Sequence, residues 1–321
     1  MGKEIVKLMN GAYRDGIPFL FAVDFELKNY IFIKHPLSQS EILFRTPQIS
    51  NINRNSFIKE KIEFESYPES YERYLERFNV VMSGLKRGDS FLTNLTVRTP
   101  IKMSLGLKDI AESCDAPFCL YVPDKFVCFS PERFVKIKEN KISSYPMKGT
   151  IDASIPNAEQ IILSDEKETA EHNTIVDLIR NDIGIVAKDV NVERFRYVDE
   201  LRTNKGHILQ TSSEIIGTMY HDECMHLGDV IFAMLPAGSV SGAPKQSTLN
   251  IIEKAELMPR GFYSGVFGYF DGAAFDSAVM IRFIEQDNNE FYFRSGGGIT
   301  VMSNPRDEYE EVIQKIYLPI I

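Results

Sequence analysis

Glutamates spaced three positions apart occur in two segments that lie far apart in the chain. Glu168 and Glu171 belong to residues 163–182, and Glu308 and Glu311 lie near the C-terminal end. Residues three apart share one face of a helix, so each pair predicts an acidic helix face. If the fold brings the two faces together, their oxygens suit Mg²⁺, a hard cation that needs few carboxylates and keeps several waters. Two separate solvated faces are the alternative, and the spacing alone favours that alternative.

A lysine stands directly before a glycine in YPMKGT, residues 145–150. Lys148 lies at a predicted strand end, where its amine could be held in a defined position. Burial beside other cations would lower the pKa of this amine and make it nucleophilic. The alternative is an ordinary surface lysine in a turn, which is the better interpretation for a lysine taken in isolation.

An arginine interrupts an apolar strand pattern in VMIRF. Arg282 is predicted at a strand position whose neighbouring side chains point the other way. Such an arginine needs an anionic partner, and a bidentate clamp on a ligand carboxylate and an internal salt bridge are equally good answers. Tyr263 and Lys315 could complete a clamp. Lys315 could equally form a helix salt bridge with Glu311, four residues before it.

Two stretches of small residues could expose backbone N–H groups to an anion. They are residues 235–245 (LPAGSVSGAPK) and residues 294–300 (RSGGGIT), and the second contains Gly296, Gly297 and Gly298. Such loops can bind carboxylate or phosphate oxygens, although neither matches a P-loop and each could be a tight turn. His172 beside Glu171 could be a ligand or base, but a single histidine on a helix is more often a packing residue.

Composition indicates an ordinary globular protein. The chain has 321 residues, of which 44% are hydrophobic and 25% are charged, so it can bury a substantial core. Its formal net charge is −9 with acids and bases interspersed, which argues against a nucleic-acid-binding surface. An anionic substrate would then need local cations from a metal or from a few placed arginines and lysines.

Targeting and redox features predict a cytoplasmic protein. The N-terminus lacks the apolar core of a signal peptide, and no apolar run approaches the ~18 residues that span a membrane. The cysteines have no metal-ligand spacing and fit buried reduced thiols: Cys114, Cys119, Cys128 and Cys224. We therefore expect neither a membrane nor a nucleic acid as a partner.

Hydrophobic periodicity predicts antiparallel strands between separate helices. Helices are expected at residues 68–86, 163–182, 226–234, 246–257 and 304–317, with Ser164 or Asp165 capping the second and Asn304 the last. Strands are expected at residues 17–34 (two), 91–101, 118–145 (three), 190–200, 207–219 and 266–300, the last group with turns at Asp271–Gly272 and Asn288–Asn289. Residues 35–66 are predicted to be a long surface connection. This order predicts an α+β fold with residues 1–321 as one compact unit.

Seven motifs together carry a resemblance that none carries alone. SPERF, PMKGT, KETAEH–IVDLIRND, PAGSVSGAPK, RGFYSGVFGYFDG–DSAVMIR, SGGGIT and PRDEYEE follow one another within residues 84–318. This set resembles the chorismate-utilising enzymes, which include anthranilate synthase component I, aminodeoxychorismate synthase component I, and the isochorismate and salicylate synthases. Residues 1–80 look like a short version of the variable N-terminal part of that family. The resemblance implies two large, mainly antiparallel sheets packed face to face with helices outside.

The resemblance also implies a site. By motif position, Mg²⁺ would be bound directly by Glu171 and Glu311, and through waters by Glu168 and Glu308. Substrate-binding residues would be Thr150, Tyr263, Arg282, the backbone N–H groups of Gly296, Gly297 and Gly298, and Lys315 near the ring carboxylate. A dianion that enters an acidic protein needs such a cation.

The position of Lys148 discriminates among the branches. PMKGT resembles the PIKGT of the aminodeoxychorismate enzymes, in which this lysine is implicated as a nucleophile, whereas the anthranilate enzymes typically have PIAGT. A lysine that activates water in the isochorismate and salicylate enzymes is replaced here by Leu92. Where many relatives have a histidine linked to pyruvate elimination, this chain has Gln210, with His207 three residues away as the other alignment. No LLES-like segment or tryptophan is present, so a tryptophan feedback site is not expected.

The resemblance therefore implies an aminodeoxychorismate synthase component I activity. Chorismate and ammonia would give 4-amino-4-deoxychorismate for p-aminobenzoate and folate through a covalent lysine adduct. A separate glutamine amidotransferase subunit would supply the ammonia. Anthranilate synthase component I activity is the alternative within the family. A non-catalytic chorismate-binding subunit is an alternative of another class, against which the four glutamates and Lys148 count.

Overall fold

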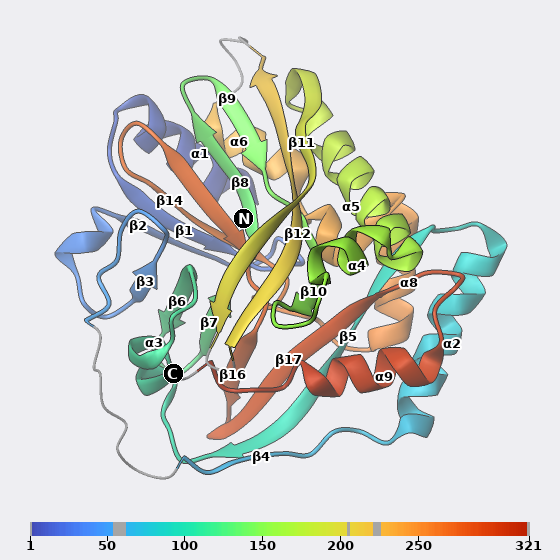
Figure 1. Cartoon of the computed structure of the whole chain (residues 1–321). Coiled ribbons are helices and arrows are strands. Elements are labelled where there is room, and N and C mark those ends of the chain that lie inside the picture. Colours follow the sequence, from blue (N-terminus) through green and yellow to red (C-terminus); the bar gives the residue numbers. More distant parts are fainter. Residues whose placement is uncertain (1, 54–61, 204–205, 221–225, 320–321) are drawn as a thin grey trace.

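Two large sheets form the centre of the molecule (Figure 1). A computed structural model describes residues 2–53, 62–203, 206–220 and 226–319. In spatial order the nine-stranded sheet contains β10 (Met147–Asp152), β12 (Gly206–Met219), β9 (Lys141–Ser144), β8 (Arg133–Lys138), β15 (Phe275–Val279), β14 (Val266–Phe270), β1 (Phe19–Val23) and β2 (Tyr30–Lys34), with β11 (Ala187–Thr203) beside β12. The eight-stranded sheet contains β13 (Gly242–Ala243), β5 (Leu92–Met103), β17 (Glu290–Ile299), β16 (Phe283–Asp287), β7 (Phe126–Ser130), β6 (Phe118–Val122) and β3 (Leu43–Arg45), with β4 (Phe64–Ser66) beside β5.

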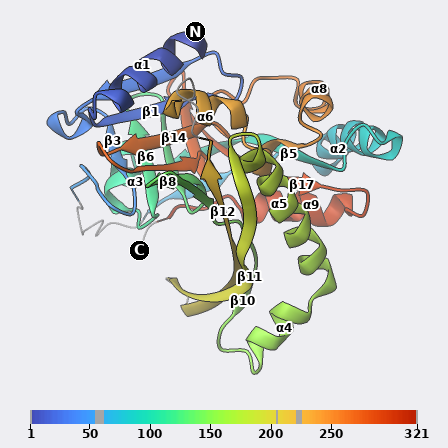
Figure 2. The same cartoon turned by 90° about the horizontal axis from the view of Figure 1, so that it is seen from above.

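Helices cover the outside of the sheets. They are α1 (Gly2–Arg14), η1 (Pro36–Ser38), α2 (Tyr71–Arg87), α3 (Leu107–Ser113), α4 (Ala158–Ser164), α5 (Glu166–Gly184), α6 (Leu227–Met234), α7 (Gly238–Ser241), α8 (Lys245–Glu256) and α9 (Pro305–Gln314). Seen from above, α4 and the far ends of β10 and β11 project away from the rest, while α5 and α9 lie near each other (Figure 2). None of the helices in the described part is long and apolar enough to cross a membrane.

The apolar core between the sheets confirms the predicted face-to-face packing. Leu20 and Ala22 of β1 and Phe267 of β14 come from the nine-stranded sheet, and they share one cluster with Leu120 of β6 and Phe283 of β16 from the other sheet. Alternate residues of a strand point to opposite faces, so the remaining β1 side chains pack on the other side. There they join a second cluster that α1 and α6 cover. The fold is therefore α+β, as expected.

Two predicted elements differ from the structure, and one helix was not predicted. The single helix expected at residues 163–182 is two helices, because Asp165 adopts an extended backbone and its side chain caps α5 by accepting from the N–H of Glu168 at 2.9 Å. Residues 35–66 are not only a surface connection, since all three residues of β3 are buried against β6. The first residues form α1, which the sequence patterns did not predict and which buries Ile5, Met9 and Ala12.

The chain crosses from one sheet to the other at Arg282. β15 belongs to the nine-stranded sheet and β16 to the eight-stranded sheet, and Arg282 between them has a left-handed backbone with φ 53°. The prediction that Arg282 lies inside a strand is therefore wrong. The interpretation of Gly296–Gly298 as a loop is also wrong, and the strand expected through residues 266–300 is confirmed there, because these glycines lie within β17 and pair with residues 94–96 of β5.

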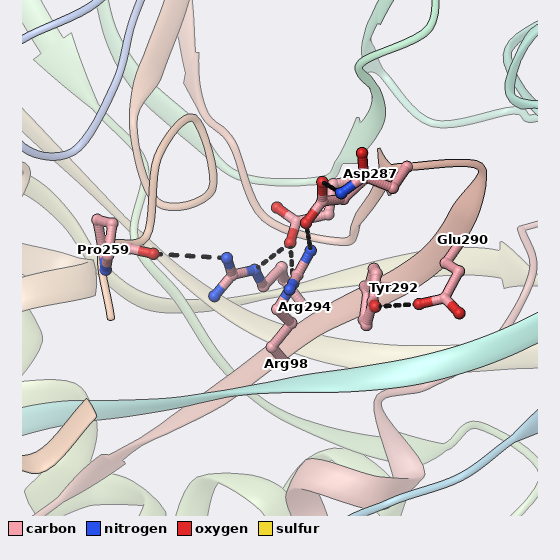
Figure 3. Close-up of polar contacts among 8 residues, drawn as sticks. Arg98, Pro259, Asp287, Glu290, Tyr292 and Arg294 are labelled. Carbon is pink, nitrogen blue, oxygen red and sulfur yellow. Dashed lines mark hydrogen bonds and ion pairs between the residues drawn. The ribbon is translucent and has the colours of Figure 1, made fainter. Parts of the chain in front are cut away.

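A network of ion pairs fixes the strands that lead to this crossing (Figure 3). A carboxylate oxygen of Glu285 on β16 accepts from Arg98 of β5 and, at 3.0 Å, from Arg294 of β17. Arg98 also donates to Asp287 at 2.9 Å and stacks on the ring of Tyr292, 3.5 Å from its centroid. These contacts tie three strands together and so define the register of β17, on which the glycines lie.

The described cysteines agree with the expectation of reduced thiols. Cys114, Cys119 and Cys128 are buried and free. Cys224 lies outside the described residues.

Candidate active site

The first turns of α5 carry the first glutamate pair toward β10. His172, one residue after Glu171, has no exposed surface, and its Nε2 lies 2.6 Å from the hydroxyl of Ser213 on β12. Burial, with the nearby positive charges of Arg196 and Lys148, lowers the pKa of His172 to about 4, so the ring is neutral near pH 7. The packing interpretation of this histidine is therefore the one that the structure supports, and the contact fixes the rotation of α5 that presents Glu171.

A β-bulge aims Lys148 into the site. Lys148 pairs with Thr211 and Thr150 with Gln210, so the register between β10 and β12 shifts at Gly149, whose φ is 80°. The hydroxyl of Thr211 also donates to the carbonyl of Lys148. Bulges redirect side chains in this way, and they recur beside active sites. The Lys148 Nζ lies 2.6 Å from Oε2 of Glu171.

The surroundings of Lys148 correct the expected direction of its pKa. Burial lowers the pKa of this amine, but the carboxylate of Glu171, together with those of Glu311 and Glu168, more than offsets burial. The pKa of Lys148 therefore lies above the usual value of a lysine, whereas the sequence predicted a value below it. The prediction assumed that cations would be the nearest charges, and the nearest charges are carboxylates.

The last helix brings the second glutamate pair to the same place. As predicted, Asn304 caps α9 by accepting from two backbone N–H groups, and Pro305 is the first residue of the helix. Lys315 directly after α9 forms the expected salt bridge with Glu311 at 2.6 Å and also donates to the carbonyl of Gly296 at 2.8 Å. Burial lowers the pKa of Lys315 below its usual value. The carboxylate of Glu311 acts to raise this pKa, while repulsion from Arg282 and Lys148 lowers it further. Glu308 is buried.

The two acidic faces therefore face one region. Lys148 on β10 interacts electrostatically with glutamates of both helices, Glu171 on α5 and Glu311 on α9. Lys315 interacts in turn with Lys148 and Arg282, which extends the charged region to the crossing between the sheets. In both views α5 and α9 lie on the same side of the molecule (Figures 1 and 2).

The donor set of this region fits Mg²⁺. Carboxylate oxygens are the ligands that this ion prefers, and it usually takes few of them while keeping waters. Within the described ranges, no three His, Cys, Asp or Glu side chains already form a metal-binding group. The carboxylates that the structure brings nearest to the ammonium groups of this region are those of Glu171 and Glu311. A cation bound by either carboxylate would have to compete with the ammonium group of Lys148 or Lys315.

An open strand edge faces the same region. No described strand pairs with β17 on the β16 side beyond Arg294, and Lys315 reaches the carbonyl of Gly296 there. The N–H and C=O of one residue in an antiparallel strand point the same way, so the N–H groups of Gly296 and Gly298 are directed to this edge. Gly297 cannot carry a larger side chain freely, because an added Cβ would lie 3.3 Å from Oε2 of Glu308.

Arg282 and Tyr263 lie next to this edge. Phe283 pairs with Arg294 in antiparallel register. Arg282, one residue earlier in the chain, therefore lies beside the part of β17 that follows Arg294, where the glycines begin. The Nε of Arg282 donates to the hydroxyl of Tyr317 at 3.2 Å. Tyr263 packs its ring against Phe283, and burial raises its pKa to about 12, so its hydroxyl stays protonated as a donor. An arginine, a tyrosine hydroxyl and backbone N–H groups together suit a carboxylate.

Sequence reasoning missed one residue of the site, Glu132 in the SPERF motif. Burial raises the pKa of Glu132 above its usual value. The hydrogen bond from Ser239 and the positive charges of Arg282, Lys315 and Lys148 lower this pKa, but they do not offset burial. Ser239 in α7 donates its hydroxyl to Oε1 of Glu132 at 2.6 Å. A carboxyl group with a raised pKa among cationic side chains can hold a proton and deliver it. The only sequence signal was a carboxylate at the junction between two apolar strands, β7 and β8.

The remaining predicted residue, Thr150, is exposed on β10 opposite Gln210. His207 is exposed too, and it lies toward the far end of the hairpin, where its Nδ1 contacts Glu200 at 2.6 Å. Gln210, rather than His207, is therefore in register with the strand residues that surround Lys148.

Comparisons with known proteins identify similar sequences and a similar fold. A family model described as chorismate binding enzyme matches residues 37–320. An uncharacterized PabA-like protein of Haemophilus influenzae is 47% identical over 99% of this chain and 97% of its own length. Aminodeoxychorismate synthase component 1 of Bacillus subtilis is 30% identical over 78% of this chain, which spans about half (55%) of that protein. The crystal structure of anthranilate synthase component I from Streptococcus pneumoniae superposes with a TM-score of 0.66 at 28% identity, covering 80% of this chain and 59% of the other.

Proposed function

The chain belongs to the chorismate-binding enzyme family, and from that premise we propose that it is an aminodeoxychorismate synthase component I. It would convert chorismate and ammonia to 4-amino-4-deoxychorismate, a precursor of p-aminobenzoate and folate. The observation that carries the proposal is the place of Lys148, whose amine lies among the glutamates of two helices, 2.6 Å from Glu171. A nucleophile at this position is what distinguishes this reaction from those of the other branches.

The proposed cofactor is Mg²⁺, held directly by Glu171 and Glu311 and through waters by Glu168 and Glu308. When bound, the ion would act as a Lewis acid that neutralises the ring carboxylate of the substrate. Lys315 would lie near the same carboxylate. Tyr263, Arg282 and the N–H groups of Gly296 and Gly298 would hold the enolpyruvyl carboxylate, and Thr150 on β10 would border the ring. The N–H of Gly297, which the sequence also suggested, points toward β5 and would not take part.

Lys148 and Glu132 would perform the chemical steps. The uncharged amine of Lys148 adds to C2 of chorismate, the two ring double bonds shift, and the C4–O bond breaks. Glu132 gives its proton to the departing hydroxyl, which leaves as water. Ammonia then adds at C4 and expels the Lys148 amine, and the Glu132 carboxylate takes one proton from the new ammonium group. Atoms and protons balance when the Lys148 ammonium group loses one proton to solvent before its attack and regains one after its release, so that both residues return to their starting states.

Gln210 supports a product that keeps its enolpyruvyl group. An amide side chain does not titrate near neutral pH, so a glutamine in this position cannot act as the acid or base that a histidine could supply for elimination of pyruvate. Gln210 pairs with Thr150 at the bulge that carries Lys148. The alternative within the family, anthranilate synthase component I, would require pyruvate to leave.

Ammonia would come from a separate glutamine amidotransferase subunit. Glutamine hydrolysis by that class uses an accessible cysteine nucleophile. In the described ranges every cysteine is buried, which supports a division of labour between two proteins.

The product formed from chorismate, MgCl₂ and an ammonium salt tests the proposal. We expect p-aminobenzoate to appear only after an aminodeoxychorismate lyase is added, because the lyase removes the enolpyruvyl group. Fluorescent anthranilate without any lyase would instead support the alternative enzyme. Chorismate binding without turnover would support the non-catalytic subunit, and either result would refute the proposed activity.

A further inference from the structure

The proton donor Glu132 is held by a loop that comes from a distant part of the chain. Ser239 lies in α7, within the stretch PAGSVSGAPK, and its hydroxyl donates to Oε1 of Glu132 at 2.6 Å. The two residues are 107 positions apart. The anion-binding role that the small residues of this stretch suggested does not explain why a serine hydroxyl meets a carboxyl group here.

The loop itself is anchored on α5. Asp182, near the end of that helix, accepts from the backbone N–H of Gly238 at 3.1 Å and from Nζ of Lys245 at 3.1 Å. Lys245 also donates to the carbonyl of Met234 at 2.7 Å, so one lysine closes both ends of the loop. A Cβ at Gly238 would lie 1.8 Å from Leu178, which means that the loop backbone rests directly on the helix.

We propose that Ser239 is a positioning residue for Glu132, which fixes the orientation of the carboxyl group and the oxygen that carries its proton. This inference rests on the proposed function, in which Glu132 protonates the leaving hydroxyl. The same helix, α5, would then place both reacting groups, because it presents Glu171 beside Lys148 at one end and holds the Ser239 loop at the other.

The contact leaves one carboxyl oxygen for the transferable proton. In the proposed arrangement the Ser239 hydroxyl donates to Oε1, which leaves Oε2 to carry the proton of the acid form. In the proposed step the Oε2–H bond breaks, an O–H bond forms on the C4 hydroxyl, and the C4–O bond breaks as water leaves. Glu132 remains as a carboxylate, which the same serine hydrogen bond stabilises.

A small cavity beside this contact allows a matched test. It has a volume of ≈ 20 Å³ and is lined by Glu132, Ser239, Asp182 and Met234 among others. That is space for about one water-sized group, so a methyl group added at Ser239 can be accommodated. Ser239→Thr keeps the donor and Ser239→Val has the same shape without it, so the two variants differ only in the hydroxyl. Ser239→Ala is a further donor-free variant that adds no volume.

The test compares the pH profiles of kcat/KM for chorismate in these variants. The limb at which activity falls with rising pH reports a group that must be protonated. Loss of the serine donor removes an interaction that favours the carboxylate, so we expect this limb to move up by about 1 pH unit in Ser239→Val and Ser239→Ala. We also expect kcat to fall about tenfold, with KM for chorismate within about twofold of the wild-type value because Ser239 does not bind substrate. Ser239→Thr should behave as wild type.

Identical profiles and rates for the threonine and valine variants would overturn the positioning role. Ser83→Val is the control for the substitution itself, because Ser83 bonds a carbonyl of its own helix on an exposed face. Glu132→Gln separates the two hypotheses. If Glu132→Gln is inactive and the Ser239 pair is indistinguishable, only the inference on Ser239 fails. If Glu132→Gln keeps full activity, the proposed proton donor is wrong and the inference fails with it.

Discussion

The ammonium nitrogen of Lys148 lies 2.6 Å from Oε2 of Glu171. The proposed nucleophile therefore forms an ion pair with a proposed metal ligand. Burial lowers the pKa of the lysine, but the carboxylate of Glu171, together with those of Glu311 and Glu168, outweighs burial, so that the pKa lies above its usual value. An amine must be uncharged to attack carbon. A cation that takes the Glu171 carboxylate has to displace this ammonium group and so removes the interaction that keeps it protonated.

Competition between Lys148 and Mg²⁺ for Glu171 predicts that loss of the lysine strengthens metal binding. The ion pair is partly exposed, with 34% and 30% of the two side chains accessible, so its contribution is modest. We expect Lys148→Met to bind Mg²⁺ about threefold to tenfold more tightly by calorimetry without chorismate. The control is Lys108→Met, which breaks an exposed helix pair with Glu112. Equal affinities in the wild type and both variants would show that the lysine and the ion do not share Glu171.

The bulge at Gly149 predicts a position-specific effect of alanine. An added Cβ would lie 2.9 Å from Oε2 of Glu168, at a φ of +80° that side chains rarely adopt. Gly149→Ala should therefore cost about 1–2 kcal/mol of stability through the backbone and lower activity at least about tenfold by moving Glu168 and Lys148. Gly16→Ala is the matched control, because Gly16 has a φ of +64° and open space around its Cβ. An active Gly149→Ala enzyme would indicate that the bulge does not position the site.

A buried ion pair beneath the site predicts a large loss of stability. Arg260 and Glu256 form two hydrogen bonds at 2.7 and 2.9 Å with almost no exposed surface, and Arg260 also donates to carbonyls of Val240 and Asn94. Glu256→Gln leaves the arginine charge without its partner, so we expect the free energy of unfolding to fall by about 3–5 kcal/mol in urea titrations. Asp177→Asn removes one partner of an exposed pair with Arg180 and should cost less than about 1 kcal/mol. Equal losses of unfolding free energy in the two variants would mean that the buried pair contributes no more to stability than the exposed pair.

The neutral His172 predicts a stability that falls in mild acid. Its pKa is about 4 in the folded protein and near 6.5 when unfolded. Above pH 6.5 both states are neutral and the full stability is present. Between pH 6.5 and 4 only the unfolded chain takes up the proton, so stability declines by roughly 3 kcal/mol in total from this residue.

The pH dependence of the unfolding free energy, measured by denaturant titrations from pH 7.5 to 4.5 (about the range of this change), checks that value. His172→Gln cannot titrate there and should have a shallower slope than the wild type. Parallel slopes would show that His172 gains a proton in the folded state as readily as in the unfolded one.

Features set by neighbouring residues could be predicted from the sequence. Asp165 and Asn304 cap their helices as expected, because an N-cap depends on side chains within one turn. The turns at Asp271–Gly272 and Asn288–Asn289 join the expected strands for the same reason.

Features set by distant partners could not be predicted. The bulge at Gly149 depends on β12, and the crossing at Arg282 depends on two separate sheets. The direction of the Lys148 pKa was predicted wrongly because it depends on which charge the fold places nearest. Glu132 was missed because its partner Ser239 comes from a segment 107 positions away.

The most direct test of the account is mass spectrometry of the product made by the wild type and by Lys148→Ala, together with a measurement of chorismate binding. The nucleophile role predicts that the wild type forms 4-amino-4-deoxychorismate from chorismate and ammonium, while Lys148→Ala binds chorismate but does not aminate C4. Amination by Lys148→Ala at the wild-type rate would contradict the central claim.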